Sequence, residues 1–498
     1  MKITIDKSDK TPVYLQIAGQ IKESIYAGII PDGYVLPSER ALSAEIGVHR
    51  NTVTKAYDEL KTEDIIESVQ GKHCRVSFGR KRDEGVQSKA GLQSRAGLRP
   101  KDVNWDALIR REYSLFRTDF DDLYSRGFDS RYISFAGGVA SGEIYPPEEI
   151  ASVFERVIRS KDNKAYFYTT YQGDPELRKE IAGYMASKGI KATAANVQIF
   201  SENNQALDFI LSLMLSPGDA VIIEDTMSAD VYRTIEVAGG RLITVPTDEN
   251  GMICDMLDAV IEKEKPKFIY VDSSFNNPSG TILPMERRQK LLELSYRYRI
   301  PIIEEDEGSE LYYGENPVPS IKSMDRGGNV IYMYSFSLTM IPGIGMSFVI
   351  ADRKLIKQFA GMVSLRITNT DWTAQMVMLE YMKNGLFIRR LEDFRTLYKT
   401  KRDRMCRRLD KLVTRYGLEY RKPEGGVYLW VRIPGRASSR KLLEEAQKRG
   451  LTFMPGYVFF TKPSMGRSYF RLNYSYPSEE EIEKGMDILV EAIDEVMR

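Results

Sequence analysis

The stretch GVHRNTVTKAYDEL, residues 47–60, decides how the first part of the chain is expected to fold. Its apolar residues recur at the spacing of one helix face, and they are Val53, Ala56, Tyr57 and Leu60. The residues left for the outer face are polar, and they are Arg50, Asn51, Thr54 and Lys55. Because Gly47 interrupts the preceding pattern, a helix that starts near residue 50 and buries one stripe is predicted.

Two further helices and a hairpin are predicted around this one. An apolar stripe predicts a helix over residues 11–27, formed by Tyr14, Ile17, Ile21 and Ile25. A short helix ending at Ile46 is expected next, with Ser38 as its N-cap. Residues 65–76 predict two short strands around a turn at 70–72. Three helices followed by a hairpin predict a winged helix-turn-helix over residues 1–78.

This segment resembles the winged-helix domain of GntR-type transcription regulators. The motifs that carry the resemblance are PVYLQI (12–17), LPSER (36–40) and GVHRNTVTKAYDEL (47–60). The resemblance implies that Arg40, Arg50 and Thr52 contact a double-stranded DNA operator, and that Gly71 and its neighbours lie in a wing at the minor groove.

Asn51 joins this candidate DNA-binding set because it lies at the start of the third helix, the end that enters a major groove. His49 departs from the hydroxyl residue usual at its position in the family. The alternative is a small helical domain whose surface charges are merely solvated, since acids and bases roughly balance in this segment.

Composition narrows the function classes. The 498 residues have room for about three domain-sized units. The formal net charge is +1, so the overall charge of the protein favours binding to neither nucleic acid nor a membrane. Any DNA contact must therefore come from a local cluster of suitable side chains. The N-terminal residues are too polar for a signal peptide, and no apolar run reaches the ~18 residues of a membrane span. A cytoplasmic protein without a membrane partner is expected.

Histidine and cysteine usage restricts the chemistry. The two histidines, His49 and His73, both lie in the N-terminal module. Nucleophile systems that need histidine and histidine-ligated zinc are therefore excluded from the rest of the chain. The three cysteines are isolated from one another, so no metal site is predicted.

The rest of the chain divides by composition. Residues 79–104 are rich in Gly, Ser, Gln and basic residues, which predicts a flexible linker. In residues 105–498, apolar runs alternate with amphipathic helices. The alternation predicts a mainly parallel sheet with helices on both faces in a large lobe over about 128–384, and a small α+β lobe over about 385–498.

Six motifs in this part occur in one order: ISFAGGVASGEIYP (133–146), YQGDPELRKEIAGYM (171–185), FNNPSG (275–280), IIEEDEGSELYY (302–313), YSFSLTMIPGIG (334–345) and FRLNY (470–474). Together they resemble the fold-type I aminotransferases, which use pyridoxal phosphate (PLP). Fused to a GntR-type module, this is the layout of MocR-like regulators. The resemblance implies a head-to-tail homodimer that binds an amino acid or PLP as a signal.

The resemblance also locates the residues that would hold PLP, and several of them have changed, both in these motifs and in the segments around residues 202 and 228. The position of the Schiff-base lysine is Leu338, and that of the phosphate-binding arginine is Gly345. Glu202 and Asn203 stand where a small pair usually caps the phosphate, and a carboxylate there repels a dianion. The stacking tyrosine is replaced by Ser228.

In the family, one strand supplies the acid that faces the pyridine nitrogen of PLP, and this strand has changed as well. Glu305 stands where a shorter acid is expected, and Glu307 replaces a tyrosine. Four family residues are retained, namely Asn277, Ser335, Ser337 and Arg471. The last of these normally binds a substrate carboxylate, although it can also be a plain ion-pair residue.

These residues favour a DNA-binding transcription regulator whose pseudo-aminotransferase domain dimerises and senses a small anionic metabolite, with no cofactor and no catalytic residue predicted. Two alternatives stay open. The first is a PLP-dependent aminotransferase, or a PLP-sensing MocR regulator, that uses an atypical site. The second is a domain that only dimerises and binds no ligand.

Overall fold

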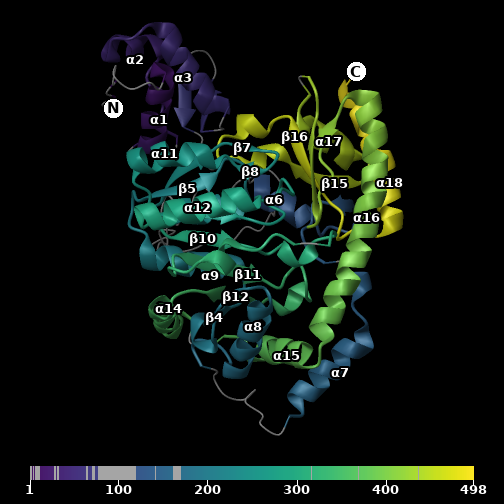
Figure 1. Ribbon diagram of the computed structural model, residues 1–498. Coiled ribbons are helices and arrows are strands. Elements are labelled where there is room, and N and C mark those ends of the chain that lie inside the picture. The colour runs from purple at the N-terminus through teal and green to yellow at the C-terminus, as the bar shows by residue number, and fades with distance from the viewer. Residues whose placement is uncertain are drawn as a thin grey trace, which may run out of the picture. The chain divides into compact units, whose positions relative to one another are not determined.

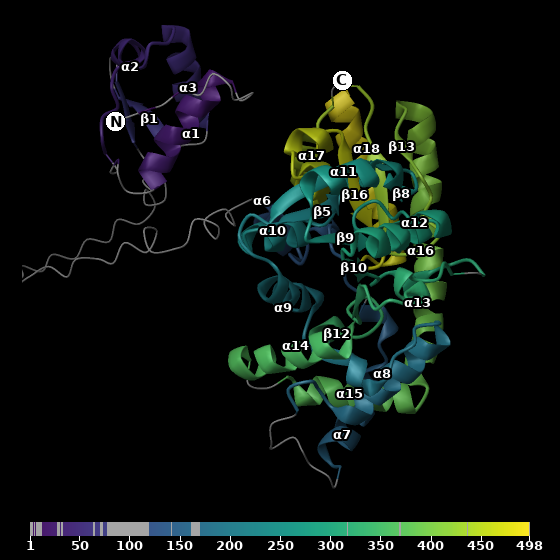
Figure 2. The same ribbon diagram turned by 60° about the vertical axis from the view of Figure 1, so that its left-hand side comes forward.

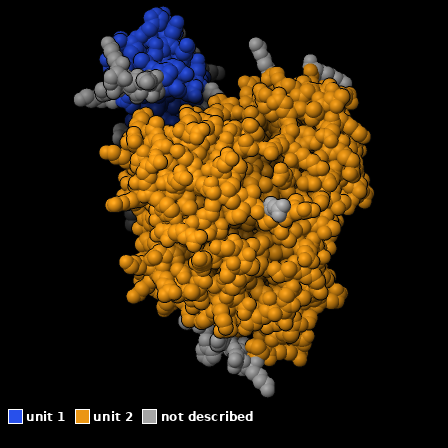
Figure 3. Space-filling model, viewed as in Figure 1, with its two compact units in different colours: residues 1–115 blue, residues 116–498 orange. Residues whose placement is uncertain are grey.

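The computed structural model describes residues 3, 5, 12–26, 30, 33–62, 65–69, 73–76, 119–140, 142–160, 170–315, 317–367, 370–435 and 437–497. The chain forms two compact units, residues 1–115 and 116–498 (Figure 3). The predicted linker and the start of the predicted second domain lie outside the described residues, so the boundaries at 78 and 104 stay a prediction. In the described part of the chain, every helix is too short or too polar to cross a lipid bilayer.

Unit 1 has the three helices and the hairpin that were predicted. They are α1 (Val13–Tyr26), α2 (Glu39–Ile46), α3 (Arg50–Thr62), β1 (Ile66–Val69) and β2 (His73–Val76). The two strands pair antiparallel, with Ile66 opposite Val76. The predicted stripes of α1 and α3 meet in one core, where Ile17, Ile21, Val53 and Ala56 are fully buried.

Local signals in the sequence fix the turn between α2 and α3. The Ser38 hydroxyl accepts a hydrogen bond from the backbone N–H of Ala41 at 3.2 Å, as an N-cap should. Gly47 ends α2 with φ +69°, a backbone conformation that glycine adopts at no steric cost. The buried hydroxyl of Tyr57 donates to the Pro37 carbonyl at 2.8 Å and holds α3 against the start of α2.

Unit 2 is built on a seven-stranded sheet, seen in Figure 1 from β5 down to β4. The spatial order is β4 (Val197–Phe200), β12 (Ser347–Ile350), β11 (Val330–Ser335), β10 (Ile302–Glu305), β9 (Phe268–Asp272), β5 (Ala220–Glu224) and β6 (Arg241–Val245). Only β12 runs antiparallel to its neighbours in this sheet. The predicted parallel sheet is confirmed, and β12 is a strand that the sequence analysis did not identify.

Helices cover both faces of this sheet, as predicted. Alternate strand residues enter different cores: Val221 and Ile223 pack on one side, and Ile222 packs on the other. The first core is shared with α9 (Asn203–Met214), α10 (Ala229–Val237) and α14 (Arg353–Arg366). The opposite side is covered by α11 (Leu257–Glu264), α12 (Met285–Tyr298), α8 (Pro175–Ser187) and α15 (Trp372–Lys383).

A second sheet forms the smaller lobe. Its order is β13 (Glu419–Tyr420), β14 (Tyr428–Arg432), β16 (Tyr469–Asn473), β15 (Leu451–Pro455) and β3 (Ile133–Phe135). Its helices are α17 (Ser439–Lys448) and α18 (Glu479–Met497). The sequence analysis assigned residues from about 128 onward to the large lobe, whereas β3 pairs parallel with β15 of the smaller lobe. A pairing so distant in the chain leaves no local signal.

The remaining elements connect these layers. They are α6 (Asp119–Arg126), α7 (Pro147–Ile158), α13 (Ile321–Met324), the short pair β7 (Thr247–Asp248) and β8 (Gly251–Met252), and α16 (Leu386–Tyr416). The long helix α16 runs along one side of unit 2 (Figures 1 and 2). It packs on α15 at one end and on α18 at the other, so it ties the two lobes together.

Candidate functional site

A cavity of about 450 Å³ lies in unit 2, where β9, β10 and β11 end at one edge of the large sheet. Polar loops beyond the carboxyl ends of parallel strands are the usual place for a ligand in such a sheet. The cavity brings together ten of the predicted site residues: Glu202, Asn203, Ser228, Asn277, Glu305, Glu307, Ser335, Ser337, Leu338 and Arg471. Gly345 lies just behind this wall, since a Cβ there would be 3.0 Å from Oε1 of Glu202.

The lining is strongly acidic. Five carboxylates contribute to it, and they are Glu202, Asp230, Asp272, Glu305 and Glu307. Arg471 supplies the one cation among the described lining residues, and none of them is a lysine. Sequence reasoning missed Asp230 and Asp272. The sequence could have indicated Asp272 by its position at the end of a buried strand, and Asp230 by its position in the first turn of α10.

Glu305 is held at the floor of the cavity by two neutral donors. Its Oε1 accepts from Nδ2 of Asn203 at 2.9 Å, and its Oε2 accepts from the Tyr270 hydroxyl in a short contact. Burial raises the pKa of Glu305, and these hydrogen bonds oppose the rise. Nearby, burial and then the charge of Glu305 raise the pKa of Asp272 well above its usual value. Neither carboxylate has a cation beside it in the described lining.

A hydrogen-bonded chain of hydroxyls links Glu202 to the loop after β11. The Ser337 hydroxyl donates to Oε2 of Glu202 at 2.9 Å and lies 2.8 Å from the Ser335 hydroxyl. Burial, together with the negative charges of Glu305 and Glu202, raises the pKa of Glu307 to about 8, and a hydrogen bond with Ser335 opposes this rise. Glu307 is therefore mostly protonated at neutral pH.

Leu338 follows this hydroxyl pair and lines the cavity with a side chain that is only 5% exposed. It packs into the same core as β11, so its place at the site is fixed by apolar contacts. The following turn at Pro342–Ile344 ends at Gly345, which has φ +47°. The Tyr145 hydroxyl donates to the Met340 carbonyl at 2.7 Å and anchors the loop.

Arg471, on β16, also lines the cavity. Its guanidinium donates to Oδ1 of Asn277 at 2.6 Å and to the Ala136 carbonyl at 2.7 Å. It lies over the rings of Tyr428 and Phe459 at 4.3 and 4.9 Å. Arg471 is 5% exposed and makes no ion pair with a described residue. Burial accordingly lowers its pKa.

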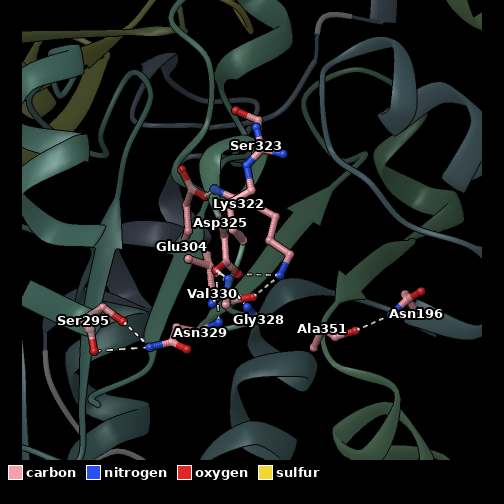
Figure 4. Close-up of polar contacts among 12 residues, drawn as sticks. Asn196, Ser295, Glu304, Lys322, Ser323, Asp325, Gly328, Asn329, Val330 and Ala351 are labelled. Atoms are coloured by element: carbon pink, nitrogen blue, oxygen red, sulfur yellow. Dashed lines mark hydrogen bonds and ion pairs between the residues drawn. The ribbon is translucent and has the colours of Figure 1, made fainter. Parts of the chain in front are cut away.

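A second group of acidic residues, Glu304 and Asp325, lies close in sequence to the cavity residues and holds the fold together. Glu304 points away from Glu305 because neighbouring strand residues face opposite sides. Its oxygens accept the backbone N–H groups of Ile321 and Lys322 at 2.7 and 2.8 Å. Figure 4 shows this region, where the Lys322 ammonium lies between Asp325 and the Val330 carbonyl at 3.0 and 2.7 Å. Its carboxylates have cationic partners: Glu304 lies 3.7 Å from Arg288, and Asp325 lies 3.0 Å from Lys322.

The candidate DNA-contact residues of unit 1 lie on the outer face of the helix-turn-helix. Arg40, Arg50 and Asn51 are exposed, and Thr52 is half-buried. The Arg50 guanidinium forms an ion pair with Glu39 at 3.1 Å, and Glu39 also accepts from the Thr54 hydroxyl. Gly71 and the rest of the predicted wing tip lie outside the described residues.

Comparisons with known proteins decide the family. The family described as "Aminotransferase class I and II" matches residues 133–489, and the family described as "Bacterial regulatory proteins, gntR family" matches residues 13–76. The "Probable rhizopine catabolism regulatory protein MocR" of Rhizobium meliloti is 25% identical over 463 residues, 93% of this chain and 90% of that one. The chain belongs to the aminotransferase class I and II family and is a MocR-like GntR regulator.

Other relatives of this MocR-like regulator fall into two groups. YisV of Bacillus subtilis, an uncharacterized HTH-type transcriptional regulator, is 25% identical over 492 residues, 99% of this chain and 98% of that one. "Aromatic-amino-acid aminotransferase 1" of Thermococcus litoralis is 30% identical over 375 residues, 74% of this chain and 89% of that one. The α-aminoadipate aminotransferase LysN of Thermus thermophilus has a TM-score of 0.73 and 28% identity, covering 79% of this chain and 99% of that one. Aminotransferase-fold relatives normally bind PLP.

Proposed function

We propose that this MocR-like regulator works without a PLP Schiff base. In this proposal its winged helix binds an operator in double-stranded DNA, and its aminotransferase-like domain forms a head-to-tail homodimer. The cavity of unit 2 senses a small molecule with an anionic group, and the protein acts in the cytoplasm as a regulator and not as an aminotransferase.

The observation that carries the proposal is the place of Leu338. A PLP Schiff base needs a lysine amine, and a hydrocarbon side chain cannot condense with an aldehyde. Leu338 lines the cavity at the position where the family has that lysine, and none of the described lining residues replaces it.

The surroundings of Gly345 add to this argument. The Glu202 carboxylate occupies the space beside Gly345, where the family has an arginine that binds phosphate. A carboxylate about 4 Å from one phosphate charge costs roughly 4 kcal/mol at an effective dielectric constant near 20. The residues present therefore do not fit PLP.

Arg471 supports the sensing part of the proposal. The buried guanidinium of Arg471 has no ion-pair partner among the described residues, so only two hydrogen bonds and two aromatic rings offset its desolvation. A ligand carboxylate that binds there would offset this cost with charge-assisted hydrogen bonds.

Footprinting on DNA upstream of the protein's own gene, with and without candidate metabolites, tests the proposal. We expect a protected site that disappears with Arg50→Ala and changes when a metabolite binds the wild-type protein. The absence of any protected fragment would refute DNA regulation. A footprint that no metabolite alters, together with no thermal shift by any metabolite, would instead favour a domain that only dimerises.

A further inference from the structure

A carboxylate, Glu39, lies beside the candidate DNA-contact residue Arg50. We propose that Glu39 is a positioning residue for DNA recognition, which orients the Arg50 guanidinium toward a base edge and reduces binding to DNA of unrelated sequence. This inference rests on the proposed DNA binding and goes beyond it, because it names a residue that determines sequence discrimination without contacting a base itself.

A single oxygen of Glu39 accepts three hydrogen bonds. Arg50 donates to Oε2 through Nε at 3.2 Å and through Nη2 at 3.1 Å. The Thr54 hydroxyl, one helical turn later on α3, donates to the same oxygen at 2.9 Å. A side chain held through two nitrogens has lost much of its rotamer freedom before DNA binds, so less entropy is lost in the complex.

These contacts leave one edge of the Arg50 guanidinium for DNA. Arginine has five N–H donors, and the two edges of its fork can each bind two acceptors together. Glu39 occupies the edge formed by Nε and Nη2, whereas Nη1 donates to no described residue. The edge formed by Nη1 and Nη2 therefore remains, on a side chain that is 52% exposed. Two parallel N–H groups match O6 and N7 of guanine, the commonest base contact of arginine.

The backbone around Glu39 is itself fixed. The Ser38 hydroxyl caps α2 by accepting from the backbone N–H of Ala41 at 3.2 Å, and the helix dipole favours a carboxylate in this first turn. The Tyr57 hydroxyl donates to the Pro37 carbonyl at 2.8 Å, which ties α3 to the start of α2. Substitution of Glu39 should therefore change the Arg50 side chain and leave the helices in place.

Two simpler roles do not account for this acid. A partly exposed ion pair contributes little to folding stability, and the core of unit 1 is formed by apolar residues of α1, α2 and α3. As a charge alone, a carboxylate on α2 weakens DNA binding, since the first helix of a helix-turn-helix crosses the phosphate backbone. Weaker attraction to every backbone, together with an oriented Arg50, raises the ratio of specific to non-specific affinity.

The experiment measures this ratio. Selection from random duplexes with the full-length protein gives an operator sequence, and gel-shift titration at fixed salt concentration gives the dissociation constants for this operator and for a scrambled duplex. We expect Glu39→Ala to lower the ratio of the two affinities at least about fivefold, the lower end of the discrimination by one bidentate arginine. Its affinity for scrambled DNA should stay the same or rise. Glu39→Gln keeps an acceptor oxygen and should lose less of the ratio.

Two controls separate positioning from charge and from folding. Asp58→Asn removes an exposed acid that lies about two turns further along α3 and pairs with Lys61 at 3.1 Å, so the ratio should not change. In a protein that already carries Arg50→Ala, Glu39→Ala should have no further effect on the ratio, because Glu39 acts through Arg50. Thermal unfolding of each variant checks that it is folded.

The outcomes separate this inference from the proposed function. If Glu39→Ala leaves the ratio unchanged, or weakens binding to both duplexes equally, the positioning role is refuted while DNA binding stands. If Glu39→Ala lowers the ratio equally with and without Arg50, Glu39 acts independently of Arg50 and the inference is also refuted. If the wild-type protein selects no sequence, operator binding fails and the inference fails with it.

Discussion

The Ser337 hydroxyl donates a hydrogen bond to Oε2 of Glu202 at 2.9 Å. This bond joins the start of α9 to the loop after β11, the two segments in which the resemblance places the phosphate contacts of PLP. In this chain the Glu202 carboxylate accepts a hydrogen bond from the Ser337 hydroxyl at this place, so protein groups alone hold the loop. Under the proposed function, this arrangement favours no phosphate at the place where the resemblance puts it.

Restoring the lysine alone should not restore cofactor binding. We expect Leu338→Lys to show no Schiff-base absorbance with PLP at micromolar concentration, because Glu202 still repels the phosphate and Gly345 offers it no cation. Adding Glu202→Gly should help only modestly, because it removes the repulsion but supplies no cation for the phosphate. An arginine introduced at position 345 would have to adopt the left-handed backbone of Gly345, which costs about 1–2 kcal/mol. Tight PLP binding by the single variant would show that the phosphate site is intact.

Arg50 should be a main contributor to operator binding. Arg50→Ala is expected to weaken the complex by about 1–3 kcal/mol, roughly fivefold to 150-fold, because a guanidinium at the start of α3 is placed to contact a base edge. Gel-shift titration at fixed salt concentration measures the change. The control Lys484→Ala removes an exposed cation from α18 and should leave the affinity unchanged. Equal losses in both variants would indicate a general charge effect.

Raising the pH should destabilise unit 2. The folded-state pKa of Glu307 is about 8, above that of an exposed glutamate, so the folded state binds more protons than the unfolded state between about pH 4.5 and 8. The free energy of unfolding therefore falls as the pH rises through this window and levels off above it. Buried Glu224, with its pKa also raised to about 8, acts in the same direction.

Glu307→Gln isolates one of these groups. The variant keeps a neutral side chain at all pH values, so it should be more stable than the wild type at pH 9, by on the order of a few kcal/mol, and similar to it at pH 5. Denaturant unfolding at the two pH values measures the difference. The exposed Glu444→Gln should show no such pH-dependent gain. A Glu307 variant that is equally destabilised at both pH values would contradict the assignment.

Two buried arginines should respond differently to removal of their charge. Arg288 is fully buried, lies 3.7 Å from Glu304 and donates to several carbonyl and hydroxyl oxygens, including the Leu283 carbonyl at 2.7 Å. Arg288→Met should cost about 3–5 kcal/mol of stability, since it leaves Glu304 buried without its partner. Arg471→Met should cost less, because Arg471 has no described ion-pair partner. Similar losses would mean that Arg471 is a structural residue.

Much of the fold could be predicted from local patterns. The apolar stripe of α3 and the N-cap at Ser38 can be predicted from residues close together in the chain, and the structure has both. In contrast, β12 was missed because the short run Ser347–Ile350 follows a glycine turn, without a long apolar pattern of its own. The pairing of β3 with β15 depends on contacts between segments more than 300 residues apart, which no local pattern encodes.

The candidate site was predictable only where motifs exist. The motifs located Leu338 and Arg471, the resemblance located Glu202 before a predicted helix, and the structure places all three on one cavity. Asp230 and Asp272 were not recognised, because a single acid at a strand end or in a helix turn is common in any α/β protein. Their significance depends on the convergence of separate strands, which only the folded chain shows.

The most direct test of the central claim is a titration of the purified full-length protein with PLP, followed by borohydride reduction and mass mapping. We predict that no reducible adduct forms on a residue of the cavity and that PLP does not saturate the protein at micromolar concentration. A pyridoxyl adduct mapped to a cavity residue, or saturable micromolar binding of PLP, would contradict the claim.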